Sequence, residues 1–380
     1  MSEGFTSMRN DAKGFFTCQP GGLFIGAGPC GAESPEQLEQ TAATLAATGQ
    51  VRLMRAGIWK PRTRPGSFEG YGIPALSWLV EAGKRHGLAT ATEVANAEHV
   101  EAALKAGVDV LWLGARTTVN PFYVQEIAEA LKGANVPVMV KNPMHPELPL
   151  WLGAIERLRS AGLEDLAAVH RGFYSASAGV LRNEPKWELA VGLREKMPEI
   201  PLFCDPSHIA GDRRWVTEIA QTALDLRYDG LLVEVHPHPE SALSDAGQQW
   251  PLADFGRWIS ALQVRTDERI LAELPSDLWE VRTAIDAIDR GLVALIAQRF
   301  ALLEPIAQIK KREGLALFQL DRWMEIVRTR KEWGEATGSL PEALLQELFE
   351  VIHKHGLLEQ VNAWRALPPE SLSRSAEGGC

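Results

Sequence analysis

Short apolar runs alternate with longer amphipathic stretches over residues 22–262 of the chain. Eight runs have the length of buried strands: residues 23–30, 51–58, 88–94, 108–115, 136–142, 166–173, 201–208 and 230–236. The stretches between them carry helix signals, as where Ser34 can cap a helix and Pro35 suits its first position. Apolar strands that alternate with helices indicate an α/β fold with a parallel sheet, and eight strands favour a closed (β/α)₈ barrel over an open doubly wound sheet.

The pattern changes after a last barrel helix near residues 252–264. A charged connector follows, and we place a linker at 263–276. From 277 to 366 no strand pattern occurs, and apolar residues recur at alternating spacings of four and three: Val281, Ile285, Ile288, Leu292 and Leu295. The sequence therefore predicts a second, all-α domain, flanked by an N-terminal extension (1–21) before the barrel and a disordered polar tail (367–380) at the end.

Composition narrows the possible partners and the compartment. The 380 residues include 39 Lys and Arg against 49 Asp and Glu, a net charge of -10, so no overall positive field attracts nucleic acid or an anionic membrane. The N-terminus lacks the apolar segment of a signal peptide, and no apolar run approaches the roughly 18 residues of a membrane span. The four cysteines are widely spaced, which favours free thiols. We expect a soluble, cytoplasmic protein that binds neither nucleic acid nor membrane. Because the first strand begins at residue 23, we expect no N-terminal regulatory domain.

Basic residues gather at the strand ends of the predicted barrel, where barrel enzymes build their active sites. The ends carry Arg55 with the nearby Lys60 and Arg62, then Glu93, Arg116, Lys141 and Arg171. For any one of these residues, a solvated strand end is an equally simple explanation. Together, in an acidic chain, they predict a site for several anionic groups.

Four further residues could bind a metal ion. Cys30, His208 and Glu234 end the first, seventh and eighth runs, Asp245 follows in the next loop, and the first and eighth strands are neighbours in a closed barrel. A thiolate, an imidazole and two carboxylates suit one divalent ion such as Mn²⁺, Fe²⁺, Co²⁺ or Zn²⁺ better than Mg²⁺ or Ca²⁺. An ordinary hydrogen-bonded histidine is the alternative for His208.

The motifs at these strand ends resemble those of the type I 3-deoxy-D-arabino-heptulosonate 7-phosphate (DAHP) synthases, beta subgroup. They are, in order, GPCGAES, RAGIWKPRT, ATEV, LGART, VKNP, HRGF, DPSH and EVHPHPESALSD. The KDO 8-phosphate synthases are similar to a lesser degree, because KPRT at 60–63 looks like the element that binds erythrose 4-phosphate. The resemblance covers residues 22–262.

The resemblance implies condensation of phosphoenolpyruvate with erythrose 4-phosphate to DAHP and phosphate, on a divalent metal for which Mn²⁺ is favoured. It implies that Cys30, His208, Glu234 and Asp245 bind the metal. It further implies three sets of substrate-binding residues: Arg116, Lys141 and Arg171 for the phosphate of phosphoenolpyruvate; Arg55, Lys60 and Glu93 near its carboxylate and reacting carbon; and Arg62 and Thr63 for the phosphate of erythrose 4-phosphate. Lys60 is the candidate acid for the aldehyde oxygen, whereas His236 and His238 are expected to be loop residues without a metal bond.

Two basic residues lie on the apolar seam of the helical domain. Arg299 and Lys310 are eleven residues apart, so on a continuous helix they point within about 20° of each other. A dicarboxylate ligand would neutralise both, whereas at an exposed end of the seam both side chains would reach solvent.

Residues 277–365 resemble the all-helical AroQ class of chorismate mutase. The resemblance rests on Arg282, Arg299, Lys310, Arg322 in DRW, and Gln360 at the end of IHKHGLLEQ. It implies conversion of chorismate to prephenate without a cofactor, and a homodimer in which Arg282 reaches the partner's site. We therefore expect a bifunctional shikimate-pathway enzyme whose synthase is inhibited by prephenate or chorismate through the helical domain.

The helical domain also departs from that class. Trp323, Gln319 and Gly356 stand where relatives often have glutamate, aspartate and serine, and Pro305 would disturb a helix between Arg299 and Lys310. The alternative is a helical domain that senses a ligand and dimerises without catalysis.

Overall fold

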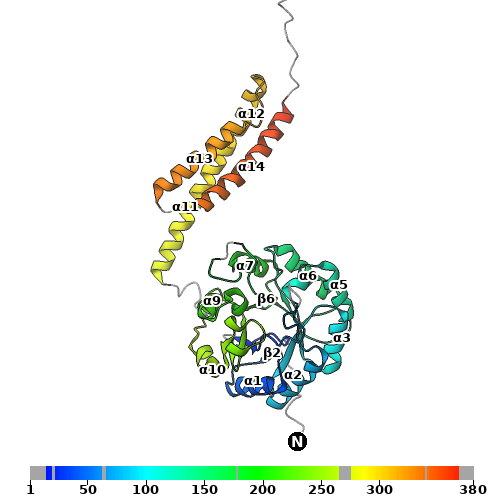
Figure 1. Cartoon of the computed structure of the whole chain (residues 1–380). Coiled ribbons are helices and arrows are strands. Elements are labelled where there is room, and N and C mark those ends of the chain that lie inside the picture. The colour runs from blue at the N-terminus through cyan, green and yellow to red at the C-terminus, as the bar shows by residue number, and fades with distance from the viewer. Residues whose placement is uncertain are drawn as a thin grey trace, which may run out of the picture. The chain divides into compact units, whose positions relative to one another are not determined.

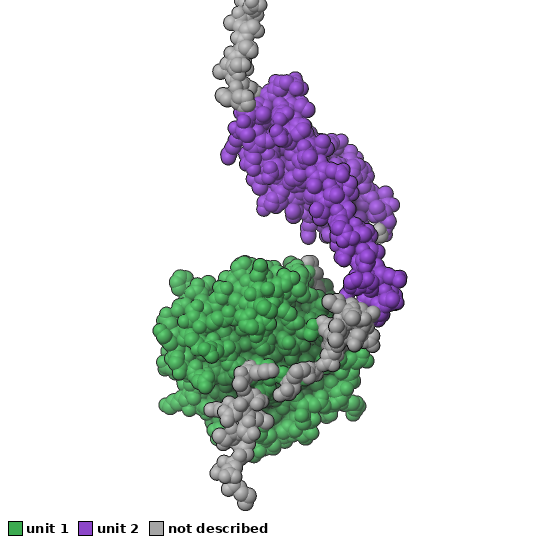
Figure 2. Space-filling view, turned by 180° about the vertical axis from the view of Figure 1, so that it is seen from behind, with its two compact units in different colours: residues 1–268 green, residues 269–380 purple. Residues whose placement is uncertain are grey.

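The computed structural model describes residues 14–18, 22–61, 66–176, 179–264, 275–338 and 340–367. The chain divides into two compact units, residues 1–268 and 269–380 (Figure 2). The sequence predictions for the N-terminal extension, the linker and the tail fall largely outside the described residues. Arg62 and Thr63 also lie outside them.

Unit 1 is a closed barrel of eight parallel strands, as the sequence predicts (Figure 1). Each strand pairs with the next, and β1 pairs with β8 from Phe24 with Gly230 to Gly28 with Glu234. The strands are β1 (Phe24–Gly28), β2 (Leu53–Arg55), β3 (Ala89–Val94), β4 (Val110–Leu113), β5 (Val138–Lys141), β6 (Leu166–His170), β7 (Leu202–Cys204) and β8 (Gly230–His236). This closure brings the ends of the first and eighth strands side by side.

Helices surround the barrel (Figure 1). They are α1 (Pro35–Ala47), α2 (Ile73–His86), α3 (Ala97–Ala106), α4 (Ala115–Thr118), α5 (Pro121–Ala130), α6 (Leu148–Ser160), α7 (Trp187–Lys196), α8 (Pro206–Ala210), α9 (Arg213–Asp225) and α10 (Leu252–Ala261). As predicted, Ser34 caps α1, because its hydroxyl accepts the Gln37 N–H at 3.1 Å, and Pro35 opens the helix.

Side chains fill the barrel interior. Phe16, Phe24 and Phe203 form an aromatic cluster, in which the rings of Phe24 and Phe203 stack with centroids 4.7 Å apart. Trp112 lies in the same buried cluster, at the level where the strands end. The barrel is therefore a packed core and not a pore, and its chemistry is confined to the strand ends.

One short strand was not predicted. β9 (Trp250–Pro251) pairs with β8, through Val235 with Trp250, and closes a loop that contains two short 3-10 helices, η2 (Pro239–Ser241) and η3 (Ala246–Gln248). Asp245 precedes η3 with φ 48°, a left-handed conformation that is uncommon for a non-glycine residue.

Unit 2 is helical throughout its described residues, as predicted. It contains α11 (Ser276–Ala301), α12 (Leu303–Arg312), α13 (Leu320–Thr337) and α14 (Glu342–Ala366), and α12 and α13 both contact α14 (Figure 1). The first helix is interrupted at Leu302. Pro305 explains this, because it has no N–H to donate to the carbonyl four residues earlier, at Ala301, where α11 ends. The assumption of one continuous helix from Arg299 to Lys310 was therefore wrong.

One helical stretch passes a simple length-and-composition test for a membrane span. The stretch Ser276–Arg312 is long and apolar enough on average to cross a membrane, with 11% of its most apolar window buried. The sequence reasoning missed it because it looked for an uninterrupted apolar run. Length and composition alone fit equally a helix whose apolar face packs on another protein helix. Arg299 and Lys310 lie in the same stretch.

Candidate active sites

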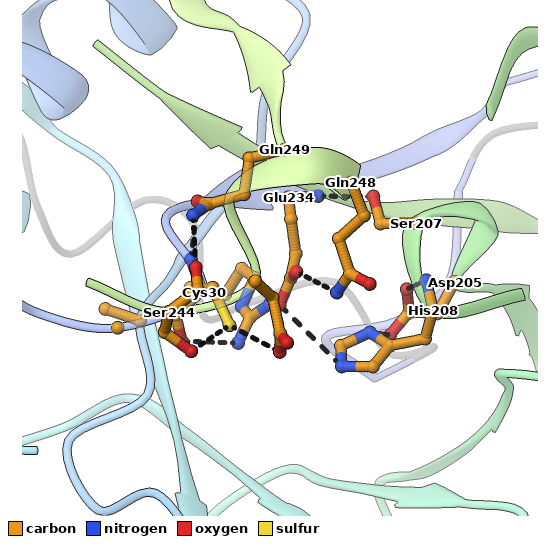
Figure 3. A network of polar contacts seen from close by, with 12 residues as sticks. Cys30, Asp205, Ser207, His208, Glu234, Ser244, Gln248 and Gln249 are labelled. Atoms are coloured by element: carbon orange, nitrogen blue, oxygen red, sulfur yellow. Dashed lines mark hydrogen bonds and ion pairs between the residues drawn. The ribbon is translucent and has the colours of Figure 1, made fainter. Parts of the chain in front are cut away.

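Three of the predicted metal ligands converge where β1 and β8 end. One ligand atom from each of Cys30, Glu234 and Asp245 lies within 4.8 Å of the others. Cys30 Sγ is 3.4 Å from Asp245 Oδ2. Cys30 and Glu234, which lie close together in Figure 3, are fully buried. The register of β1 against β8 produces this proximity, since it pairs Gly28 with Glu234.

His208 lies at the edge of this cluster. Its Nε2 is 3.8 Å from Glu234 Oε1, and its Nδ1 is 2.8 Å from Asp205 Oδ2 (Figure 3). Asp205 caps α8 by accepting the His208 N–H at 3.1 Å. One carboxylate thus caps the helix at His208 and lies beside Nδ1 of its ring, while Nε2 faces Glu234.

The charges of the cluster are strongly coupled. Burial raises the pKa of the Cys30 thiol to about 12, and the Glu234 carboxylate adds to this effect. Burial alone would raise the pKa of Glu234 as well, but the charges of His208, Arg55 and Lys60 hold it below its ordinary value. Glu234 is therefore an anion in a buried site, and its charge makes the neighbouring Cys30 thiol harder to ionise.

A second set of side chains holds the metal candidates in place. Gln248 donates to Glu234 Oε2 at 2.6 Å, and Arg182 contacts both Gln248 Oε1 at 2.8 Å and Asp245 Oδ1 at 3.1 Å. Gln249 accepts the Cys30 N–H at 2.9 Å. The loop after β8 is thus tied to both carboxylates and to Cys30.

Buried cations lie next to the cluster. Arg55, the last residue of β2, donates to Glu234 Oε1 at 2.5 Å, and its guanidinium lies 4.8 Å from the Trp112 ring centre. Lys141, the last residue of β5, pairs with Asp205 at 2.8 Å and lies 5.6 Å from the same ring. Trp112 in turn donates to Glu93 Oε2 at 3.0 Å. Side chains from β2, β3 and β5 therefore meet around one tryptophan of β4.

The remaining predicted barrel residues have different surroundings. Arg171 is buried and donates to Asn183 Oδ1 at 3.0 Å, and burial lowers its pKa to about 10. Lys60 Nζ lies 3.0 Å from both Cys30 Sγ and Cys30 O. Arg116 is exposed and contacts Pro61 O at 3.4 Å. The structure brings Lys60 to the metal candidates and keeps Arg116 at the solvent edge.

In the helical unit, two of the predicted basic residues approach α14. Lys310 Nζ donates to Leu317 O at 2.6 Å and to Gln360 Oε1 at 3.5 Å. Arg299 Nη1 lies 3.5 Å from the point where a side chain on Gly356 would begin, and it has no hydrogen-bond partner among the described residues. Arg299, Lys310 and Gln360 therefore face a common region despite the break at Leu302.

The other predicted residues of this unit lie elsewhere or are engaged differently. Arg282 is exposed on α11, and Arg322 is exposed and paired with Glu325 at 2.5 Å. Trp323 stacks on His353, with ring centres 3.9 Å apart.

Sequence reasoning missed several residues that support the barrel site. Asp205 could have been found, because it belongs to the DPSH motif that supplied His208. Arg182 and Gln248 gave no signal, since they reach the site from loops. Trp112 looked like one apolar residue of a strand.

Comparisons with known proteins agree with this division of the chain. Residues 19–269 match the model of the DAHP synthetase I family, and residues 281–361 match that of chorismate mutase type II. The phospho-2-dehydro-3-deoxyheptonate aldolase of Thermotoga maritima is 30% identical over 258 residues, which cover 67% of this chain and 71% of that protein. The 2-dehydro-3-deoxyphosphooctonate aldolase of Nitrosococcus oceani is 29% identical over 282 residues, covering 66% of this chain and 94% of that protein.

Two solved structures are similar to the barrel. The DAHP synthase of Thermotoga maritima has a TM-score of 0.58 at 30% identity, covering 63% of this chain and 68% of that one. A truncated form of 3-deoxy-D-arabino-heptulosonate 7-phosphate synthase from the same organism has a TM-score of 0.55 at 27% identity, covering 63% and 85%.

Proposed function

Because this chain belongs to the DAHP synthetase I family and also carries a type II chorismate mutase domain, we propose that it is a bifunctional, cytoplasmic enzyme of the shikimate pathway. Its barrel condenses phosphoenolpyruvate with erythrose 4-phosphate, and its helical unit converts chorismate to prephenate. One observation carries the synthase half: the candidate metal ligands meet the buried Arg55 and the half-buried Lys60 at one end of the barrel.

Cys30, His208, Glu234 and Asp245 would hold one divalent ion, with Mn²⁺ favoured and Fe²⁺, Co²⁺ or Zn²⁺ as alternatives. Sulfur, nitrogen and oxygen donors together fit such ions. His208 supports this, because a carboxylate beside Nδ1 commonly orients a histidine whose Nε2 binds a metal. When bound, the ion would polarise the aldehyde oxygen of erythrose 4-phosphate.

The chain's own side chains would bind and orient the substrates. Lys141, Arg171 and Arg116 would bind the phosphate of phosphoenolpyruvate, and Arg55 and Glu93 lie where its carboxylate and reacting carbon would be held. Lys60 would donate a proton to the aldehyde oxygen as carbon-carbon bond formation places negative charge there. Burial lowers the pKa of Lys60, but the Cys30 sulfur and the Glu234 carboxylate outweigh this and hold it above its ordinary value, so the amine is charged.

Phosphate release by the full-length protein tests the synthase. With phosphoenolpyruvate and erythrose 4-phosphate we expect turnover that a chelator abolishes and Mn²⁺ restores. Arabinose 5-phosphate is the competing aldehyde, because a 2-dehydro-3-deoxyphosphooctonate aldolase is also similar to this chain. Faster turnover with arabinose 5-phosphate would overturn the assignment of erythrose 4-phosphate.

For the mutase half, Arg299, Lys310, Arg322 and Gln360 would bind the two carboxylates and the ether oxygen of chorismate. A rearrangement without a cofactor depends on positioning and on charge stabilisation, which these cations can supply. Loss of chorismate absorbance in the full chain tests this. Lys310→Met should lower the rate at least tenfold, and an unchanged rate would contradict the assignment.

We also propose that two copies of the chain pair through their helical units. No residue of α11 is buried, although its seam is apolar: Ile288 is 63% exposed and Leu295 is 61% exposed. A second copy that covers this seam would also receive Arg282. Sedimentation should show a dimer, and Leu295→Lys should yield monomers.

The alternative function for the helical unit is ligand sensing without catalysis. It is favoured by Trp323, which occupies a position where relatives often have glutamate. Its ring stacks on His353. Calorimetry separates the two hypotheses. Binding of chorismate without its consumption would support the sensor.

Prephenate or chorismate bound to the helical unit would inhibit the synthase. This proposal rests on the short connector between the barrel and the helical unit. Synthase rates should fall at saturating prephenate in the natural chain and not in Lys310→Met. A rate that prephenate leaves unchanged would refute feedback inhibition.

A further inference from the structure

Three buried side-chain nitrogens of the helical unit have no hydrogen-bond partner among the described residues. They are Arg299 Nη1, Arg330 Nε and His353 Nε2. A buried polar nitrogen without a partner is destabilising, so such groups are usually satisfied by a ligand or by water. Arg299 already belongs to the predicted mutase site, whereas Arg330 and His353 have no assigned role.

The three side chains meet at one face of α14. His353 belongs to α14 itself, whereas Arg299 of α11 and Arg330 of α13 contact that face. Phe349, His353 and Gly356 follow one another at spacings of four and three, which places them on the same side of the helix. The Arg330 guanidinium lies 5.7 Å from the Phe349 ring centre, and Arg299 Nη1 lies against Gly356. His353 stands between these two contacts.

Gln360 continues this face of α14 by one turn, because it lies four residues after Gly356. Lys310 of α12 donates to it. Burial lowers the pKa of His353, and the positive charges of Arg299 and Lys310 lower it further, as expected for a ring close to both. Burial likewise lowers the pKa of Arg330, with smaller effects from Arg322 and Arg299.

This cluster has an excess of positive charge. Arg299, Lys310 and Arg330 form no ion pair with any described acid, although the chain carries ten more acids than bases. Partly buried cations without a counter-ion are expected to be neutralised by an anionic ligand.

The two unassigned residues are also held in fixed positions. Trp323 stacks on the His353 ring at an interplanar angle of 24°, and Arg330 lies 4.5 Å from the Trp333 ring centre while its Nη1 donates to Thr329 Oγ1 at 2.8 Å. Both side chains are thus held in place, while His353 Nε2 and Arg330 Nε have no hydrogen-bond partner among the described residues.

We propose that Arg330 and His353 are ligand-binding residues of the helical unit, which donate through Nε and Nε2 to a dicarboxylate held by Arg299 and Lys310. This inference rests on the proposed function, because the same site is expected to bind chorismate and prephenate. It adds two donors, one from α13 and one from α14, to the predicted set.

Titration of the full-length protein with prephenate tests the proposal. His353→Phe keeps an aromatic ring against Trp323 and removes the N–H, and Arg330→Met removes the guanidinium. Each should weaken binding about tenfold, because a hydrogen bond to a charged group contributes about 1.5 kcal/mol or more. Arg328→Met is the matched control, since Arg328 is exposed and pairs with Glu332 at 2.8 Å. It should leave the affinity within twofold, and His353→Gln, which keeps a donor, should recover most of it.

Binding that is unchanged in both His353→Phe and Arg330→Met would overturn the proposal. If these variants do not fold, NMR of the unmodified protein tests the proposal instead. Prephenate should shift the ¹⁵N resonance of His353 Nε2, and an unchanged resonance would overturn the proposal. A natural chain that neither binds prephenate nor consumes chorismate would refute the proposed function itself. Binding by the natural chain with unaffected variants would refute only the roles of Arg330 and His353.

Discussion

Removal of one partner from the buried ion pair between Arg55 and Glu234 should strongly destabilise the barrel. Both side chains are nearly or fully buried, at 6% and 0% exposure, and Arg55 Nη1 lies 2.5 Å from Glu234 Oε1. Arg55→Met keeps most of the aliphatic stem but leaves the carboxylate buried without its closest cation. Removal of one partner of a buried pair costs about 3 to 5 kcal/mol.

The neighbours of Glu234 place this case at the lower end of the range. Gln248 still donates to Oε2, and the charge of Lys60 still opposes that of the carboxylate. The variant also loses the contact of the guanidinium with Trp112, which contributes about 0.5 to 2 kcal/mol. We therefore expect Arg55→Met to lower the free energy of unfolding by about 3 kcal/mol.

Urea unfolding of the full chain with a chelator present measures this change. Hydrogen exchange of peptides from β1 and β8 would report on the barrel separately from the helical unit. The double variant Arg55→Met with Glu234→Gln should be less destabilised than the sum of the single variants, because no charge is then left unpaired. A loss below about 1 kcal/mol in Arg55→Met, or strict additivity, would refute the reasoning.

Three further predictions concern the barrel. Cys30→Ala should lose tight Mn²⁺ binding in calorimetry while His238→Ala keeps it, and the opposite result would undo the ligand assignment. Gly57→Ala should reduce synthase turnover with little change in prephenate binding, because the added Cβ would lie 2.6 Å from Cys30 O and 2.9 Å from the Lys60 side chain. Burial lowers the pKa of His170 to about 4. The folded state therefore favours the neutral ring, and this preference contributes nothing unfavourable above pH 6.5. As the pH falls from 6.5 to 4, up to about 3 kcal/mol of the free energy of unfolding is lost. A His170→Gln variant should show a shallower pH dependence of unfolding, and an equally steep one would contradict this role.

The barrel and the ends of its strands could be predicted because both depend on local patterns. An apolar run predicts a strand, and a polar residue near the end of the run must then lie near the strand end, as Arg55 in β2, Lys141 in β5 and Glu234 in β8 illustrate. The closure of β1 on β8 then brings Cys30 to Glu234 without any further signal in the sequence.

Other parts of the site depend on the paths of loops and on contacts between side chains far apart in sequence. Local sequence patterns do not encode such contacts. Arg182 reaches Asp245 across more than sixty residues of chain, and Trp112 contacts cations from two other strands. The break at Leu302 is an intermediate case. Pro305 signalled a disturbance, but the residue at which the helix ends follows from the carbonyl that Pro305 leaves without a donor.

The loop after β8 has a consequence for protein engineering. It leaves β8 at His236 and returns beside the same strand at β9, and Gln249 bonds to both Cys30 N and Ser244 O. The segment 244–249 is therefore a fixed unit, whereas Glu240 and Ser241 are exposed and Glu240 pairs with Arg213 at 2.7 Å. A small label attached to the exposed side chain at position 241 would take no part in the hydrogen bonds of Gln249, so the loop offers a place for a reporter in the same loop as Asp245.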